Sequence, residues 1–203
     1  MFDRRLRIPK DRLLKPFARA PFSRLHPNLY TLLAFAFGMA SAFAAWRSCF
    51  ILALVLWIAN RILDGFDGTV ARATGRQSDL GGYIDIVLDH VVYVAIPLGI
   101  ALADDTLAGY RALAVMLGSF YVNAASWMYL AALLEKRELG AAAAGELTTI
   151  TMPSGLIEGA ETIVFYTLFV LLPEQAAILF LIMAGGVLFT AAQRLVWALR
   201  VLR

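Results

Sequence analysis

Long apolar runs separated by short polar breaks make up most of this chain. Roughly 20 helical residues cross the hydrocarbon core of a membrane. The runs lack the two-residue alternation that is typical of strands in a membrane β-barrel. The pattern therefore predicts an all-α integral membrane protein with six transmembrane helices, at about 28–46, 49–71, 81–103, 108–134, 155–172 and 175–199.

The first 26 residues have a different pattern, in which eight Lys or Arg residues alternate with large apolar residues such as Phe2, Leu6 and Phe17. A cleavable signal peptide would need a short apolar core and a small-residue cleavage site, and neither is visible. We expect residues 1–26 to form an amphipathic interfacial helix on anionic headgroups, with a disordered basic tail as the alternative. Residues 27–203 then form one six-helix transmembrane domain.

Composition and charge agree with a membrane protein. The chain is 61% hydrophobic, and its mean hydropathy is +0.72. Basic residues gather before the first run, after the second and fourth, and near the C-terminus, so the positive-inside rule places both termini and the 72–80 and 135–154 connections in the cytoplasm. The pI of about 9.2 then indicates lipid headgroups rather than nucleic acid as the partner. The single cysteine, Cys49, excludes an internal disulfide.

Small residues recur at four-residue spacing in the first run, at Ala34, Gly38 and Ala42. Such a stripe lets two helices approach closely in a membrane. The sequence leaves open whether the partner helix belongs to the same chain or to a second copy.

Four aspartates interrupt the second and third runs. Asp64 and Asp67 are three residues apart, and Asp85 and Asp89 are four apart, so each pair lies on one helical face. The short connection over 73–80 makes the two helices antiparallel, which lets the acidic faces meet near the cytoplasmic end. The glycines beside the acids (Gly65, Gly68, Gly81 and Gly82) leave room for a bulky ligand.

Carboxylates in a membrane are costly and repel one another, so we expect a cation between them. Oxygen-only ligands favour Mg²⁺ or Mn²⁺, and four acids suit a two-metal site for phosphate chemistry. Arg72, one turn after Asp67 and Gly68, is placed to neutralise a phosphate. Two alternatives are a structural charge network with Arg61, Arg72 and Arg76, and a cation-coupled transporter.

The spacing of these residues is similar to a known signature. Asp64-x-x-Asp67-Gly68-x-x-Ala71-Arg72, eight further residues, then Gly81-x-x-x-Asp85-x-x-x-Asp89 resembles the CDP-alcohol phosphotransferase family in every fixed position. The resemblance implies a catalytic membrane domain that is active on the cytoplasmic side. It also implies that two copies of the chain form a homodimer. A CDP-linked lipid, often CDP-diacylglycerol, would react with a small alcohol and release CMP.

The resemblance also implies roles for individual residues. Asp64, Asp67 and Asp85 would bind metal, and Asp89 would deprotonate the acceptor hydroxyl and also contact a second metal ion. The CDP group would lie against Gly68, Ala71, Arg72 and Gly81. Asn28 and Thr31, in a stretch "HPNLYT" that also resembles the family, would lie nearby.

The acceptor alcohol is less clearly indicated. Glu158 and Glu161 share one face at the start of the fifth run. Carboxylates beside the acceptor would favour a neutral or cationic alcohol, although acids at this position also suit a helix start. Lys136, Arg137 and Arg194 could instead bind the phosphate of a glycerol-phosphate or inositol-phosphate acceptor.

Overall fold

A computed structural model describes residues 25–140 and 155–202, and the predicted interfacial segment lies almost wholly outside these residues. Each predicted run corresponds to a helix. The largest difference is at the fifth run, where the helix begins at residue 159 rather than 155. The helices are α2 (Pro27–Trp46), α3 (Phe50–Thr74), α4 (Asp79–Asp104), α5 (Leu107–Lys136), α6 (Gly159–Leu171) and α7 (Ala176–Val201), with a 3-10 turn η2 (Pro173–Gln175) before α7.

Four of these helical segments are long and apolar enough to cross a membrane: α2, α4, α5 and the continuous stretch Pro173–Val201. The chain is therefore an integral membrane protein with at least four candidate spans in its described part. The other two helices differ for physical reasons. α3 carries Arg61, Asp64 and Asp67 among its apolar residues, and α6 has only 13 residues, about 20 Å of helix.

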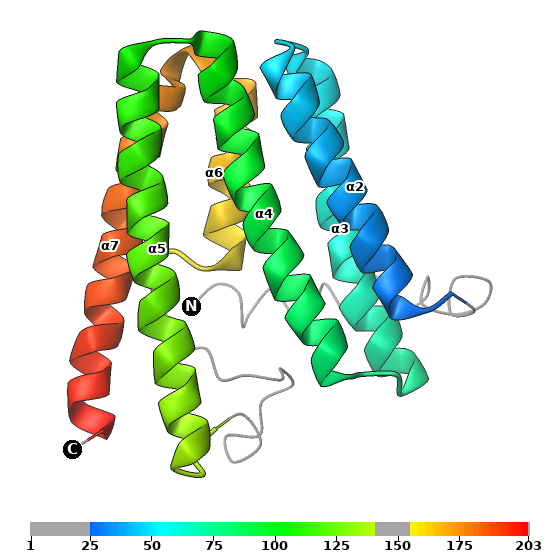
Figure 1. The fold of residues 1–203 in the computed structure, drawn as a ribbon, viewed down its shortest axis with the longest axis vertical. Helices are drawn as coiled ribbons and strands as arrows, with labels where there is room; N and C mark the ends of the chain where they lie inside the picture. Colours follow the sequence, from blue (N-terminus) through cyan, green and yellow to red (C-terminus); the bar gives the residue numbers. More distant parts are fainter. Residues whose placement is uncertain (1–24, 141–154, 203) are drawn as a thin grey trace.

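The helices form two groups that α6 connects (Figure 1). α2 packs along both α3 and α4, and α5 packs along α7, while α6 contacts α3, α4 and α7. The α2–α3 and α4–α5 turns lie at one end of the bundle, and the α3–α4 connection lies at the other end with the C-terminal ends of α5 and α7. Aromatic side chains of Trp57, Tyr166, Phe169 and Phe180 fill the centre.

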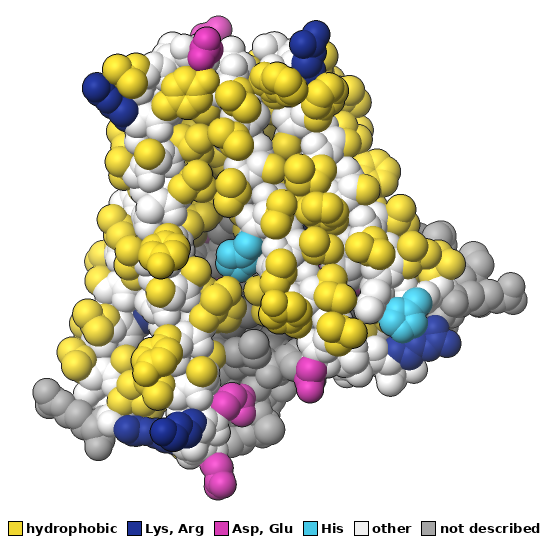
Figure 2. Space-filling model, in the orientation of Figure 1, with side chains coloured by type: hydrophobic (Ala, Val, Ile, Leu, Met, Phe, Trp, Pro, Cys, Tyr) yellow, Lys and Arg dark blue, Asp and Glu magenta, His cyan; other side chains and the backbone are white. Residues whose placement is uncertain are grey.

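The outer surface fits a lipid environment. Figure 2 shows hydrophobic side chains over the middle of the visible face, with charged side chains gathered at its two ends. Large apolar side chains such as Ile51 and Ile178 are exposed over much of their surface. A continuous apolar surface of this kind indicates contact with a membrane.

The connection between α3 and α4 places the two acidic faces opposite each other. Gly75 ends α3 with a left-handed backbone (φ 65°), which glycine adopts without steric cost. Ser78 then begins α4, and its hydroxyl accepts a hydrogen bond from the backbone N–H of Gly81 at 3.1 Å, as N-cap residues do. The chain reverses within four residues and keeps both carboxylate pairs near this end.

The small-residue stripe of α2 packs within the same chain. A Cβ atom on Gly99 of α4 would lie 2.3 Å from the carbonyl oxygen of Ala42, and one on Gly38 would lie 2.5 Å from a methyl group of Val92. The backbone oxygen of Ala34 also accepts a hydrogen bond from Asn60 of α3 at 2.7 Å. α2 thus sets the separation of α3 and α4.

We expect Gly99→Ala to destabilise the fold by about 1–3 kcal/mol, the usual cost of forcing an extra methyl group into a packed site. Gly118→Ala in α5 is the matched control, because among the described residues no atom beyond the adjoining helix backbone lies within 4 Å of a Cβ placed there. Thermal unfolding of both purified variants in detergent checks this. Equal midpoints for the two variants would contradict the close approach of α2 and α4.

Candidate active site

Three of the four aspartates form one carboxylate group. Asp64 and Asp67 of α3 and Asp85 of α4 each offer an oxygen within 4.8 Å of the others. Asp67 is the most buried, with 7% of its surface exposed. Three hard oxygen ligands drawn from two helices fit a divalent cation such as Mg²⁺ or Mn²⁺, so these residues suit the metal predicted from the sequence.

α2 orients one of these carboxylates. The hydroxyl of Thr31 donates a hydrogen bond to Asp67 Oδ2 at 2.8 Å, and the contact is buried. The backbone N–H of Gly68 donates to the other oxygen, Oδ1. Thr31, predicted near the CDP group, therefore supports a predicted metal ligand directly.

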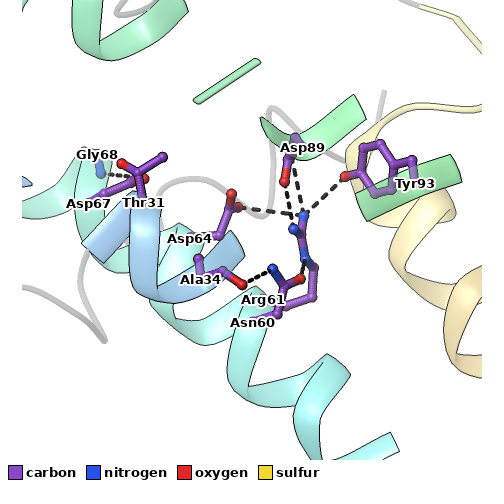
Figure 3. A network of polar contacts seen from close by, with 9 residues as sticks. All are labelled: Thr31, Ala34, Asn60, Arg61, Asp64, Asp67, Gly68, Asp89 and Tyr93. Carbon is purple, nitrogen blue, oxygen red and sulfur yellow. Dashed lines mark hydrogen bonds and ion pairs between the residues drawn. The ribbon is translucent and has the colours of Figure 1, made fainter. Parts of the chain in front are cut away.

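Asp89 faces Arg61 of α3 (Figure 3). Arg61 Nη2 lies 2.6 Å from Asp89 Oδ1, Nη1 donates to Asp89 Oδ2 at 3.4 Å, and Nη1 is 3.6 Å from Asp64 Oδ2. Asp64, Asp85 and Asp89 line a common cavity of about 10 Å³, which is close to the space of one water molecule. Asp89 is thus adjacent to the carboxylate group while it is paired with an arginine.

The guanidinium of Arg61 is held on several sides. Its Nε donates to Asn60 Oδ1 at 2.7 Å, and Nη1 donates to the hydroxyl of Tyr93 at 3.0 Å. Its carbon lies 4.7 Å from the ring centre of Trp57 and 5.3 Å from that of Tyr93. Sequence reasoning gave Arg61 only a possible structural role, although its spacing from Trp57 and Asp64 put all three on one face of the helix.

The residues predicted for the CDP group gather where α2 and α4 begin and α3 ends. A Cβ on Gly68 would lie 3.1 Å from Arg72 Nη1, and one on Gly81 would lie 3.3 Å from Asn28 Oδ1. Ala71 lies half-buried on the same stretch of α3. The missing side chains thus let the Arg72 guanidinium lie against the backbone at Gly68, and let Ser78 and Asn28 lie against it at Gly81. The guanidinium and the amide can both contact a phosphate-bearing group.

The two glutamates considered for the acceptor cap a helix. Glu158 Oε1 accepts from the backbone N–H of Gly155 at 2.8 Å, and Glu161 Oε2 accepts from that of Glu158 at 3.1 Å. The Glu158 side chain also accepts from the backbone of Glu161, and this bond and the one from Glu158 to Glu161 form a capping box at the start of α6. This contact accounts for their spacing of three residues without an acceptor.

The basic acceptor candidates lie in different surroundings. Lys136 is exposed at the end of α5, and Arg137 Nη1 donates to the backbone oxygen of Leu202 at 2.9 Å. Arg194 is buried, and its Nη1 donates to Asn123 Oδ1 at 2.6 Å. Among these three residues, only Arg194 lies inside the helix bundle.

Residues 24–192 match the CDP-alcohol phosphatidyltransferase family. The chain belongs to this family. It is 33% identical over 154 residues, 74% of this chain and 72% of the relative, to the inner membrane protein YnjF of Escherichia coli K12. An archaetidylinositol phosphate synthase of Pyrococcus horikoshii is 31% identical over 98 residues, which cover 48% of this chain and 50% of that protein.

The fold has a counterpart among solved structures. The phosphatidylinositol phosphate synthase of Mycobacterium tuberculosis, solved with manganese and citrate, superposes with a TM-score of 0.60 at 18% identity, covering 93% of this chain and 88% of that one. This likeness concerns the fold. The family assignment identifies the chain as a phosphotransferase, and the transporter alternative has no such support.

We expect Thr31→Val to weaken Mn²⁺ binding about 10-fold or more, because loss of a hydrogen bond that orients a metal ligand typically has this effect. Thr74→Val is the control, since the Thr74 hydroxyl donates, within the described part of the chain, to the carbonyl of Val70 in its own helix. Titration of each purified protein with Mn²⁺ measures both affinities. Unchanged affinity for Thr31→Val would argue against Asp67 as a ligand.

Proposed function

We propose that this protein transfers a substituted phosphate from a CDP-linked lipid, with CDP-diacylglycerol as the donor, to an acceptor alcohol, with release of CMP. The observation that carries the proposal is the group of Asp64, Asp67 and Asp85 with Asp89 beside it. Arg72 and Asn28, which lie against the backbone of Gly68 and Gly81, supply a guanidinium and an amide that support a nucleotide diphosphate at the same place.

Each part of the site then has a chemical task. Asp64, Asp67 and Asp85 would hold a divalent ion, which when bound stabilises negative charge on the phosphates. Arg72 pairs with a diphosphate oxygen. Asp89 takes the proton of the acceptor hydroxyl as the new oxygen–phosphorus bond forms and the bond to CMP breaks.

We infer that α3 and α6 also lie at membrane depth, which makes six helices in the bilayer. The charges of α3 face inward: Arg61 exposes 9% of its side chain and Asp67 exposes 7% of its surface, as expected for ionisable groups in a membrane. Four basic residues lie on the side of the α3–α4 connection. Arg72 and Lys136 are in the last turns of α3 and α5, and Arg76 and Arg137 follow those helices. The positive-inside rule supports a cytoplasmic site.

For the acceptor we propose an alcohol that carries a phosphate. Glu158 and Glu161 are engaged in the capping box, which weakens the argument for a neutral or cationic acceptor. Arg194 supplies a buried guanidinium near the start of α6, close enough to Glu158 for an electrostatic interaction. The similarity to an archaetidylinositol phosphate synthase also supports inositol phosphate.

Asp89→Asn should lower metal-dependent CMP release by at least about 100-fold, because removal of a general base typically costs 10²–10⁴. Binding of the CDP-linked lipid should remain measurable. The control is Asp105→Asn, since Asp105 follows α4 at the opposite end of that helix. Turnover near that of the wild type would contradict the role given to Asp89.

A panel of acceptors identifies the second substrate by CMP release from CDP-diacylglycerol. We expect turnover with inositol phosphate or glycerol phosphate. Arg194→Gln should then raise the KM of that acceptor about 10-fold, an effect of roughly 1.4 kcal/mol, and the exposed Arg47→Gln should not. Turnover with serine, choline or ethanolamine alone would favour the neutral or cationic class. No CMP with any alcohol, together with cation flux in vesicles, would indicate a transporter.

A further inference from the structure

Pro97 interrupts the backbone hydrogen bonding of α4. A proline has no N–H, so the carbonyl four residues earlier loses its helical partner, and the proline ring also crowds that carbonyl. In α4 this carbonyl belongs to Tyr93. Pro97 itself is buried, and a backbone oxygen freed inside a membrane bundle needs a donor from a neighbouring helix.

Tyr166 of α6 supplies that donor. Its hydroxyl donates to the backbone oxygen of Tyr93 at 2.5 Å, and the side chain has 0% of its surface exposed. The ring of Tyr166 also lies against those of Trp57 and Tyr93, with 5.4 Å and 5.2 Å between the ring centres. Packing needs only the ring, so the hydroxyl has a separate task.

The hydrogen bond lies one helical turn beyond the proposed base. Asp89, Tyr93 and Pro97 are spaced by four residues and share one face of α4. One turn of an α-helix is about 5.4 Å long. A shift of the backbone at Tyr93 is therefore passed on to Asp89 and, one turn earlier, to Asp85.

The two halves of α4 are held differently. The buried residues of this helix begin at Val92, and Gly99 lies against α2, where a Cβ would be 2.3 Å from the carbonyl oxygen of Ala42. Residues 79–91, which carry both aspartates, include no buried residue in the described structure. The backbone that joins the two halves therefore determines where the carboxylates lie.

We propose that Tyr166 is a positioning residue of the active site. Its hydroxyl takes the place of the N–H that Pro97 lacks, and so fixes the turn of α4 that sets Asp89 for the acceptor hydroxyl. This inference rests on the proposed function for the role of Asp89, whereas the hydrogen bond can be tested by unfolding, without any turnover.

A double-mutant cycle with Pro97→Ala in the full-length protein tests the inference, because alanine restores an N–H that can donate to the Tyr93 carbonyl. In the wild-type background, Tyr166→Phe leaves that buried carbonyl unsatisfied. The thermal unfolding midpoint should fall by about 3 °C or more. The kcat of CMP release should fall at least about 10-fold, while the KM for the CDP-linked lipid changes less than about twofold.

In the Pro97→Ala background the same substitution should matter far less. Tyr166→Phe should then lower kcat by less than about threefold and the midpoint by less than about 1 °C, because the two sites share one carbonyl. Equal losses in both backgrounds would overturn the inference, and so would an unchanged kcat for Tyr166→Phe alone. Tyr110→Phe is the matched control, since its hydroxyl donates to the exposed Asp105 at the far end of α4. Its midpoint and kcat should match those of the wild type.

If Pro97→Ala does not fold, amide hydrogen exchange in Tyr166→Phe takes its place. Exchange over residues 90–100 of α4 should become at least about fivefold faster, with exchange in α7 unchanged, because the freed turn opens locally. Exchange equal to that of the wild type would overturn the inference. A wild type that releases no CMP, with the coupling of the unfolding midpoints intact, would refute the proposed function and leave the hydrogen bond standing.

Discussion

The ion pair between Arg61 and Asp89 is the contact on which the arrangement of this site depends. A charge pair inside an apolar bundle persists only when its remaining hydrogen-bonding groups are satisfied. Asn60 and Tyr93 meet that need for the guanidinium, and Asn60 in turn binds the backbone of α2. Three helices are therefore fixed relative to one another by the requirements of one side chain.

The helices and the acidic group could be predicted from the sequence because both depend on local spacing. Apolar runs of membrane length located each helix to within a few residues. The motif from Asp64 to Asp89 was enough to indicate the family. The pairing of small residues in α2 with α4 could not be assigned in advance. Its partner, Gly99, lies in a different helix, and nothing in the spacing of Ala34, Gly38 and Ala42 identifies it.

Other features needed the tertiary structure for physical reasons. The spacing of Glu158 and Glu161 fits a capping box and an acceptor pocket equally well, and only the hydrogen bonds separate the two. The position of Arg61 on the acidic face of α3 was visible, but its contact with Asp89 depends on how α4 is rotated and on where Tyr93 points. The apolar run over 155–172 also did not reveal that its helix begins only at Gly159 and has 13 residues, fewer than an ordinary span needs.

The order of the helices along the chain has a consequence for how the site matures. Thr31 and the carboxylate group belong to α2, α3 and α4, which are synthesised before α6. Trp57 and Tyr93, which face Arg61, are in turn held by α6: Trp57 Nε1 donates to Thr167 at 3.1 Å, and the Tyr166 hydroxyl donates to the backbone oxygen of Tyr93 at 2.5 Å. The acids and the Arg61–Asp89 pair thus belong to helices that are made before α6. The two rings beside the arginine gain their contacts to Thr167 and Tyr166 only once α6 has been made.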